Sequence, residues 1–235
     1  MSIELAANGL PKTSEWLFPE YDFAQMNPDE YAGVVIERIL DRGSWAEVNW
    51  AYDFYGEKRL ADWVRQHGFR LLSPRSFALW RLILGVDDFV APDWAVKAKE
   101  MDTRLTGADV SFIYQHHPLL EPTIDYEGVP LASPTDIGIM KLAAINSRGT
   151  RRDFVDLYCL RDIAPIRRLV ELAEVKYADR SSFLDITVRA LAYFADAEQQ
   201  PMPRLLWQNV KWAEVVRYCE AGAKWLTQRL RDKHR

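Results

Sequence analysis

The stretch 131–160, LASPTDIGIMKLAAINSRGTRRDFVDLYCL, holds the signals that begin two helices and end the first of them. Ser133 precedes Pro134 and has Asp136 three positions later, which predicts a helix N-cap, a proline in the first turn and a carboxylate at the third helical position. Apolar residues then recur at helical spacing, at Ile137, Met140, Ala144 and Ile145. The segment that begins at Pro134 is therefore predicted to be a helix.

The break between the two helices lies at Gly149. A glycine at this place favours the end of a helix, and Thr150 with Asp153 three residues later predicts a capping box that starts the next helix. The capping box by itself is a structural role, so Asp153 has a structural as well as a functional interpretation.

Charged side chains gather around this break. Lys141 and Arg148 are seven residues apart, so they project from nearly one face of the first helix, and Asp153 and Asp156 lie one turn apart in the second. Asp156 can pair with Arg152 in its own helix or with Lys141 across the junction. Guanidinium groups bind phosphate bidentately, so three arginines are candidate phosphate or nucleotide ligands: Arg148, Arg151 and Arg152.

This pattern resembles the nucleotidyltransferase-like toxins of the AbiEii/AbiGii family, which belong to abortive phage infection and toxin–antitoxin systems. The resemblance covers roughly residues 104–220. The matching residues are Ala132-Ser133, Asp136-Ile137, Met140-Lys141-Leu142, Ala144, Arg148-Gly149, 153–158 (DFVDLY), Lys176-Tyr177, 193–198 (YFADAE), Pro201, Pro203 and Trp212. In active relatives the lysine and the acidic segment lie near the nucleotide, so the resemblance makes Lys141, Asp153 and Asp156 the candidate catalytic residues.

One part of the family pattern is missing. Members that transfer a nucleotide carry a Gly-Ser turn followed by an Asp-x-Asp pair, which holds the Mg²⁺ ions that bridge the phosphates. The only Gly-Ser here is Gly43-Ser44, placed between two predicted helices, and Asp87-Asp88 are adjacent, so along a strand they would point to opposite faces. The sequence therefore predicts no metal site and no cofactor. Adjacent His116 and His117 have no partner at ligand spacing.

The N-terminal part is predicted to be helical. Cap and stop residues predict helices over about 27–41, from Ser44 to Gly56, from there to His67 with Gly68 as the stop, and from Ser73 to Gly85. This part resembles a small domain of unknown function that is often encoded beside these toxins, in the position of an antitoxin. The pieces that carry this likeness are 16–18, 35–40, Tyr55-Gly56 and 72–75.

Short β-segments are predicted between the two helical parts. They are 109–114, where apolar residues alternate, then 122–126, and 129–131 after a turn at Glu127-Gly128. In the related transferases these would be the later strands of the sheet. We expect the N-terminal helices to cover the apolar face that the missing earlier strands would leave.

The fold class predicted from these elements is α+β and mostly α-helical: a helical N-terminal part, a short β-segment from the later strands of a nucleotidyltransferase-like sheet, and a C-terminal helical bundle. The predicted organisation is a flexible N-terminus at 1–15, a helical antitoxin-like domain at 16–90 and a partial nucleotidyltransferase-like domain at 104–235. The boundary is expected between residues 87 and 103.

Composition is that of an ordinary globular protein, with 49% hydrophobic and 27% charged residues. No apolar run approaches the roughly twenty residues of a membrane helix, and the first residues do not resemble a signal peptide. With only two cysteines, a disulfide framework is not expected, so the cytoplasm is the expected location. The net charge of −4 disfavours bulk attraction to nucleic acid.

Three functions remain open. The first is a non-catalytic protein of a toxin–antitoxin or phage-defence system that binds a toxin partner or RNA. The second is an active nucleotidyltransferase that moves a nucleotide from an NTP to an RNA or protein acceptor, using Mg²⁺ held by a different set of carboxylates. Its candidates are Asp109, Asp125, Asp153 and Asp156. The third is a self-associating structural module. We favour the first, because the metal-binding pair is missing.

Overall fold

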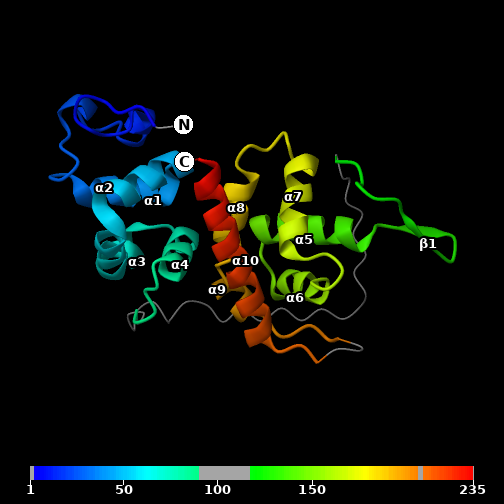
Figure 1. Ribbon diagram of the computed structural model, residues 1–235. Helices are drawn as coiled ribbons and strands as arrows, with labels where there is room; N and C mark the ends of the chain where they lie inside the picture. Colours follow the sequence, from blue (N-terminus) through cyan, green and yellow to red (C-terminus); the bar gives the residue numbers. More distant parts are fainter. Residues whose placement is uncertain (1–2, 90–116, 206–208, 235) are drawn as a thin grey trace.

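We analysed a computed structural model of the chain, which describes residues 3–89, 117–205 and 209–234. The predicted strand 109–114, with Asp109, and the predicted boundary beyond residue 89 lie outside the described residues. The described part is mainly helical, with one antiparallel pair of strands, as predicted (Figure 1). Its α-helices are α1 (Ala32–Arg42), α2 (Trp45–Trp63), α3 (Phe69–Leu71), α4 (Pro74–Ile83), α5 (Pro134–Ser147), α6 (Arg151–Cys159), α7 (Ile166–Lys176), α8 (Phe183–Ala190), α9 (Ala195–Glu198) and α10 (Trp212–Lys233).

The N-terminal residues from position 3 onward are folded against the helices. Two 3₁₀ turns, Lys12–Leu17 and Phe23–Gln25, lie before α1, and Leu10 is completely buried. The structure thus differs from the predicted flexible N-terminus, because an apolar side chain in this segment fits the core. Helix α1 also begins later than predicted, since Asn27 accepts the backbone N–H of Asp29 and forms a separate turn.

Helix α2 begins at the predicted capping box, in which Ser44 and Glu47 exchange hydrogen bonds. Gly56 interrupts the helix as predicted, with φ 75° and ψ 151°. The predicted stop at Gly68 is wrong, because the chain continues through a π-helical turn, Val64–Gly68, into α3. A Cβ at Gly68 would lie 2.9 Å from the Phe77 ring, so this glycine serves close packing and not a helix end.

The C-terminal part is built around α5 and α10. Helix α5 begins at Ser133, whose side chain accepts the N–H of Asp136, and α6 begins at the Thr150–Asp153 capping box. Helix α5 packs against α6, α7 and α8, while α10 contacts α6, α7 and α8 and also α2 and α4. The buried residues of both parts therefore form one continuous core, with α10 between them (Figure 1).

Polar contacts join the two parts along α10 and α8. Asn49 Nδ2 donates to the Arg231 carbonyl at 2.9 Å, and the Arg231 guanidinium lies 3.8 Å from the centre of the Tyr52 ring. Trp45 Nε1 donates to Asp185 at 2.6 Å. The N-terminal helices thus cover α8 and α10. The strands at 124–126 and 129–131 lie elsewhere, so the prediction that these helices cover a sheet is wrong for the two described strands.

The two described strands, β1 (Ile124–Tyr126) and β2 (Val129–Leu131), form an antiparallel hairpin. Glu127 and Gly128 have φ of 51° and 81°, the left-handed conformations that a tight two-residue turn requires. All residues of both strands are exposed, and the hairpin projects from the helical body (Figure 1). No helix among the described residues is long and apolar enough to cross a membrane.

Candidate functional site

The charged residues predicted around the α5–α6 break come together in the structure. Lys141 Nζ lies 3.2 Å from Asp153 and 2.7 Å from Asp156, so the lysine joins the two helices. Arg148 reaches the same Asp153 with Nε at 3.0 Å and Nη2 at 3.1 Å. Because α5 and α6 each present these groups at a spacing of one or two turns, the junction itself assembles the cluster.

Asp153 is the centre of this cluster and its side chain is completely buried. Besides Arg148 and Lys141, it accepts the Thr150 hydroxyl at 2.6 Å. Burial by itself would raise the pKa of Asp153, but the hydrogen bonds from Arg148 and Thr150 and the charge of Lys141 outweigh it and lower the pKa to about 2. Asp153 is therefore an ionised carboxylate whose two oxygens are both occupied.

A groove of about 390 Å³ runs along α5 beside the cluster, and we call it the α5 groove. Lys141, Arg148 and Arg180 line it, together with His117 and Tyr177, and no carboxylate of the described residues belongs to its lining. Arg148 keeps most of its side chain exposed, and its Nη1 takes no part in the contacts with Asp153. The groove thus presents cationic groups to a ligand.

The three predicted phosphate-binding arginines do not share one site. Of them, only Arg148 lines the α5 groove. The Arg151 guanidinium lies 4.7 Å from the centre of the Trp212 ring and donates to the Glu198 carbonyl at 3.0 Å. Arg152 is exposed on α6. Sequence reasoning placed the three together because they are close in the chain, but a helix turns successive side chains in different directions.

A second buried ion pair was missed by sequence reasoning. Lys176 Nζ lies 2.7 Å from Asp136 Oδ1, and both side chains are almost completely buried. Asp136 also accepts the backbone N–H groups of Leu120 and Glu121 and the Ser133 hydroxyl. Asp136 was interpreted only as a capping residue. The signal that could have revealed the pair is that both residues lie within the family-like motifs.

The carboxylates considered for an alternative Mg²⁺ site do not form one among the described residues. Asp153 and Asp156 are held by Lys141 and Arg148, and Asp125 accepts the N–H of Gly128 within the hairpin turn. No group of three His, Cys, Asp or Glu suited to a metal occurs in the described part of the chain. This donor set does not fit a divalent cation. Asp109 and His116 lie outside the described residues.

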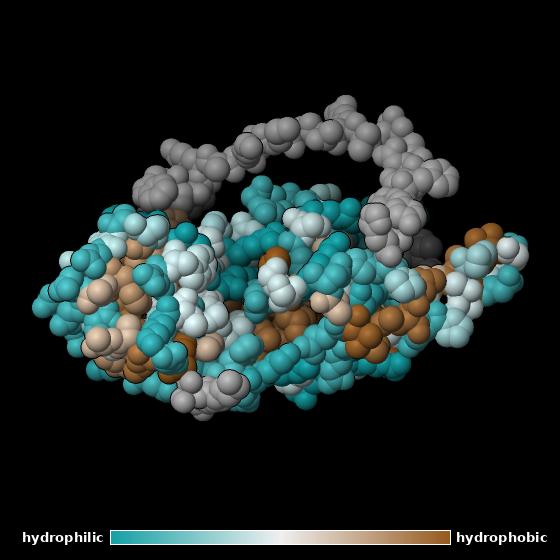
Figure 2. Space-filling model, turned by 90° about the horizontal axis from the view of Figure 1, so that it is seen from above, coloured by the Kyte–Doolittle hydropathy of each residue, from teal (hydrophilic) through white to brown (hydrophobic). Residues whose placement is uncertain are grey.

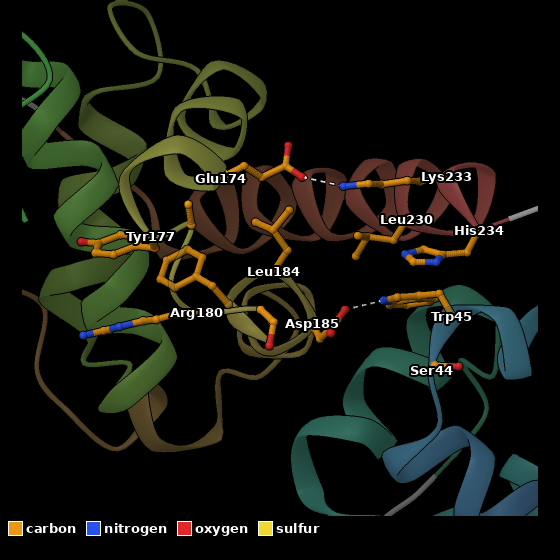
Figure 3. Close-up of a pocket in the computed structure, with 13 residues that line it drawn as sticks. Ser44, Trp45, Glu174, Tyr177, Arg180, Leu184, Asp185, Leu230, Lys233 and His234 are labelled. Atoms are coloured by element: carbon orange, nitrogen blue, oxygen red, sulfur yellow. Dashed lines mark hydrogen bonds and ion pairs between the residues drawn. The ribbon is translucent and has the colours of Figure 1, made fainter. Parts of the chain in front are cut away.

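A second cavity, of about 450 Å³, lies where the start of α2 meets α10 and the segment between α7 and α8 (Figure 3). Both of its acids are engaged by neighbouring side chains, and Arg180 lines this cavity as well as the α5 groove. Glu174 binds Lys233 at 3.2 Å, and Asp185 accepts the hydrogen bond from Trp45. Because acids belong to its lining, this cavity suits an anionic ligand less well than the α5 groove does.

Comparison with known proteins identifies two family domains in the chain. Residues 109–212 match the family described as nucleotidyl transferase AbiEii toxin, type IV toxin–antitoxin system, and residues 13–64 match a family of unknown function (DUF6922). An uncharacterized protein of Aquifex aeolicus (strain VF5) is 30% identical over 156 residues, which are 63% of this chain and 71% of that protein. No solved structure matches the chain. Both resemblances predicted from the sequence are confirmed: the chain carries a domain of the AbiEii nucleotidyl transferase toxin family at residues 109–212, preceded by a DUF6922 domain at residues 13–64.

Proposed function

We propose that this protein acts in a toxin–antitoxin or phage-defence system of the cytoplasm by binding RNA in the α5 groove, without transferring a nucleotide. The observation that carries the proposal is the pairing of Asp153 and Asp156 with Lys141 and Arg148. A carboxylate that is to hold Mg²⁺ needs free oxygens, and these two would have to release their cations first. The cluster is therefore suited to holding side chains in place.

The α5 groove supplies the binding chemistry. Arg180 lies 5.4 Å from the centre of the Tyr177 ring and lines the groove, in which the described residues place no carboxylate. Arg148 can contact a phosphate with Nη1 while its other nitrogens stay on Asp153. Two acids offset Lys141 and Arg148, so the excess of positive charge is modest. Few phosphates would be neutralised, and the affinity is therefore expected to fall only moderately with salt.

The test is the binding of a labelled single-stranded RNA, followed by fluorescence anisotropy at several salt concentrations. Arg180→Gln and Arg148→Gln are expected to weaken binding about tenfold, the loss that corresponds to one charged contact of roughly 1.4 kcal/mol. Arg152→Gln is the matched control, since Arg152 is exposed on α6 and does not line the groove. Equal losses in all three variants, or no binding by the wild type, would refute the proposal.

Nucleotide transfer remains the second candidate, and its support is that Lys141, Asp153 and Asp156 lie together and that Lys141 lines the groove. It requires Asp156, the more exposed acid, to leave Lys141 and bind Mg²⁺ with NTP. A rise in melting temperature that needs both Mg²⁺ and NTP, and that is lost in Asp156→Asn, would favour this candidate over RNA binding.

A further inference from the structure

The β1–β2 hairpin carries an apolar face that nothing among the described residues covers. Ile124 lies opposite Leu131 and Tyr126 opposite Val129, so these four side chains share one face of the hairpin. Their exposed fractions are 52%, 44%, 62% and 55%, respectively. Figure 2 shows hydrophobic side chains on the hairpin at the right end of the molecule. A two-stranded hairpin is only marginally stable by itself in water. An apolar face that stays exposed on such a hairpin therefore calls for a structural explanation.

The base of the hairpin is held firmly despite this exposure. Asp136 accepts the N–H groups of Leu120 and Glu121 on one side and the hydroxyl of Ser133 on the other. One buried carboxylate thus fixes the chain before β1 and after β2, and Lys176 balances its charge. A buried ion pair thus anchors the base of a hairpin whose own strand residues are all exposed.

The two edges of the hairpin differ in their capacity to bind another strand. Tyr126 and Val129 close the two-residue turn and exchange the hydrogen bonds between the strands, so the N–H and C=O groups of the next pair, Asp125 and Pro130, face outwards. Pro130 has no N–H, which blocks the outer edge of β2. The outer edge of β1 keeps both groups of Asp125 and, among the described residues, remains open to a strand.

The charge on β1 selects the kind of strand. If a second copy of this chain paired antiparallel with β1 around its centre, Asp125 would face Asp125, and like charges directly opposite are destabilising. Glu127 in the adjoining turn adds a further negative charge. A suitable strand has a lysine or arginine opposite Asp125, which balances its charge. On the other face it has apolar residues, which cover Ile124.

We propose that β1 is a docking edge for a β-strand of a different protein, in which cationic and apolar residues alternate. The added strand would extend the hairpin to three strands, covering Ile124 and Tyr126 while its cations face Asp125. This inference does not depend on RNA binding in the α5 groove, because the hairpin side chains do not line that groove.

The test uses the full chain and two synthetic peptides of seven residues, one alternating Val and Lys and the other alternating Val and Glu. Saturable binding is measured by fluorescence anisotropy, and the docking edge is located by hydrogen–deuterium exchange. The Val/Lys peptide is expected to bind and to protect the amide of Asp125, which faces outwards from the hairpin. Asp125→Lys should weaken binding of the Val/Lys peptide at least tenfold and should improve binding of the Val/Glu peptide. Arg152→Gln on α6 should change neither affinity.

Four results would overturn the proposal: no saturable binding of the Val/Lys peptide, binding indifferent to Asp125→Lys, a stable homodimer that buries the hairpin, or an Asp125 amide already protected in the monomer. The last would mean that this chain itself supplies the covering strand. Folding of the Asp125→Lys variant is checked by its melting temperature, since Asp125 also accepts the N–H of Gly128.

Discussion

Lys176 and Asp136 form an ion pair of 2.7 Å in which both side chains are almost inaccessible to solvent. Burial raises the pKa of Asp136, but the hydrogen bond from Lys176 and those from the N–H groups of Leu120 and Glu121 outweigh it and lower the pKa. Lys176→Met is expected to reduce the free energy of unfolding by about 3–5 kcal/mol, because it leaves a buried charge without its partner. Urea denaturation at pH 7 measures the loss.

The matched control for Lys176→Met is Arg168→Met, which removes an exposed partner of Glu121 at 2.9 Å. Exposed pairs contribute about 0–1 kcal/mol, so this variant should unfold almost like the wild type. The double variant Asp136→Asn, Lys176→Met should recover part of the loss. Similar stability for Lys176→Met and Arg168→Met would contradict the structural role assigned to the buried pair.

The lowered pKa of Asp153 makes stability depend on pH in a defined direction. Its pKa falls from 3.8 to about 2 on folding, so the folded state binds the proton less tightly than the unfolded chain. The stabilisation is present above pH 4 and is lost as the pH falls from about 4 to 2, with a total of about 2 kcal/mol. About half of it should already be lost at pH 3.

The measurement compares urea denaturation of the wild type and Asp153→Asn at pH 7 and pH 3. Other carboxylates titrate in both proteins, so the difference between the two isolates Asp153. The variant should be less stable at pH 7 and should lose about 1 kcal/mol less than the wild type on acidification. An equal loss in both proteins would show that Asp153 is not held as the structure indicates.

The interruption of α2 at Gly56 depends on backbone conformation alone. Its φ of 75° and ψ of 151° are rarely adopted by residues with a side chain, and a Cβ there would meet no atom within 4 Å. Gly56→Ala is expected to lower the free energy of unfolding by about 1–3 kcal/mol. Lys58→Ala, in the same helix and exposed, should change it by less than about 0.5 kcal/mol. Thermal and urea denaturation of both variants measure these changes in the free energy of unfolding.

We expect helix α10 to make the two parts of the chain unfold as one unit. Leu226 is completely buried on this helix, which packs against α2 and α4 as well as α6 and α8. Leu226→Ala should cost about 2–5 kcal/mol and should speed hydrogen exchange equally in 35–40 and in 139–145. Exchange that rises only in 139–145 would show two independent domains, as the predicted division at 16–90 and 104–235 implies.

Local signals in the sequence predicted the elements well. Ser44, Ser133 and Thr150 begin helices as their capping partners indicate, and Glu127-Gly128 forms the predicted turn. These features depend on neighbours within a few residues. The prediction at Gly68 was wrong because glycine is typical of a helix end. Here the missing side chain allows the Phe77 ring of another helix to pack closely.

The site was predictable only in part, for a similar reason. Lys141, Arg148 and Asp153 come together because a short junction fixes their geometry. Arg180 enters the α5 groove from the segment after α7, and Lys176 reaches Asp136 from forty residues away in the chain. No local pattern indicates such pairings, since they depend on how the helices pack.

Nucleotide transfer itself is the measurement that tests the central claim most directly. The purified chain is incubated with each labelled NTP, Mg²⁺ or Mn²⁺, and total tRNA or cell extract as the acceptor, beside folded Asp153→Ala and Asp156→Ala variants. We predict no labelled product above background, because Asp153 and Asp156 are held by Lys141 and Arg148. Labelled product from the wild type that disappears in both variants would contradict this account and establish an active nucleotidyltransferase.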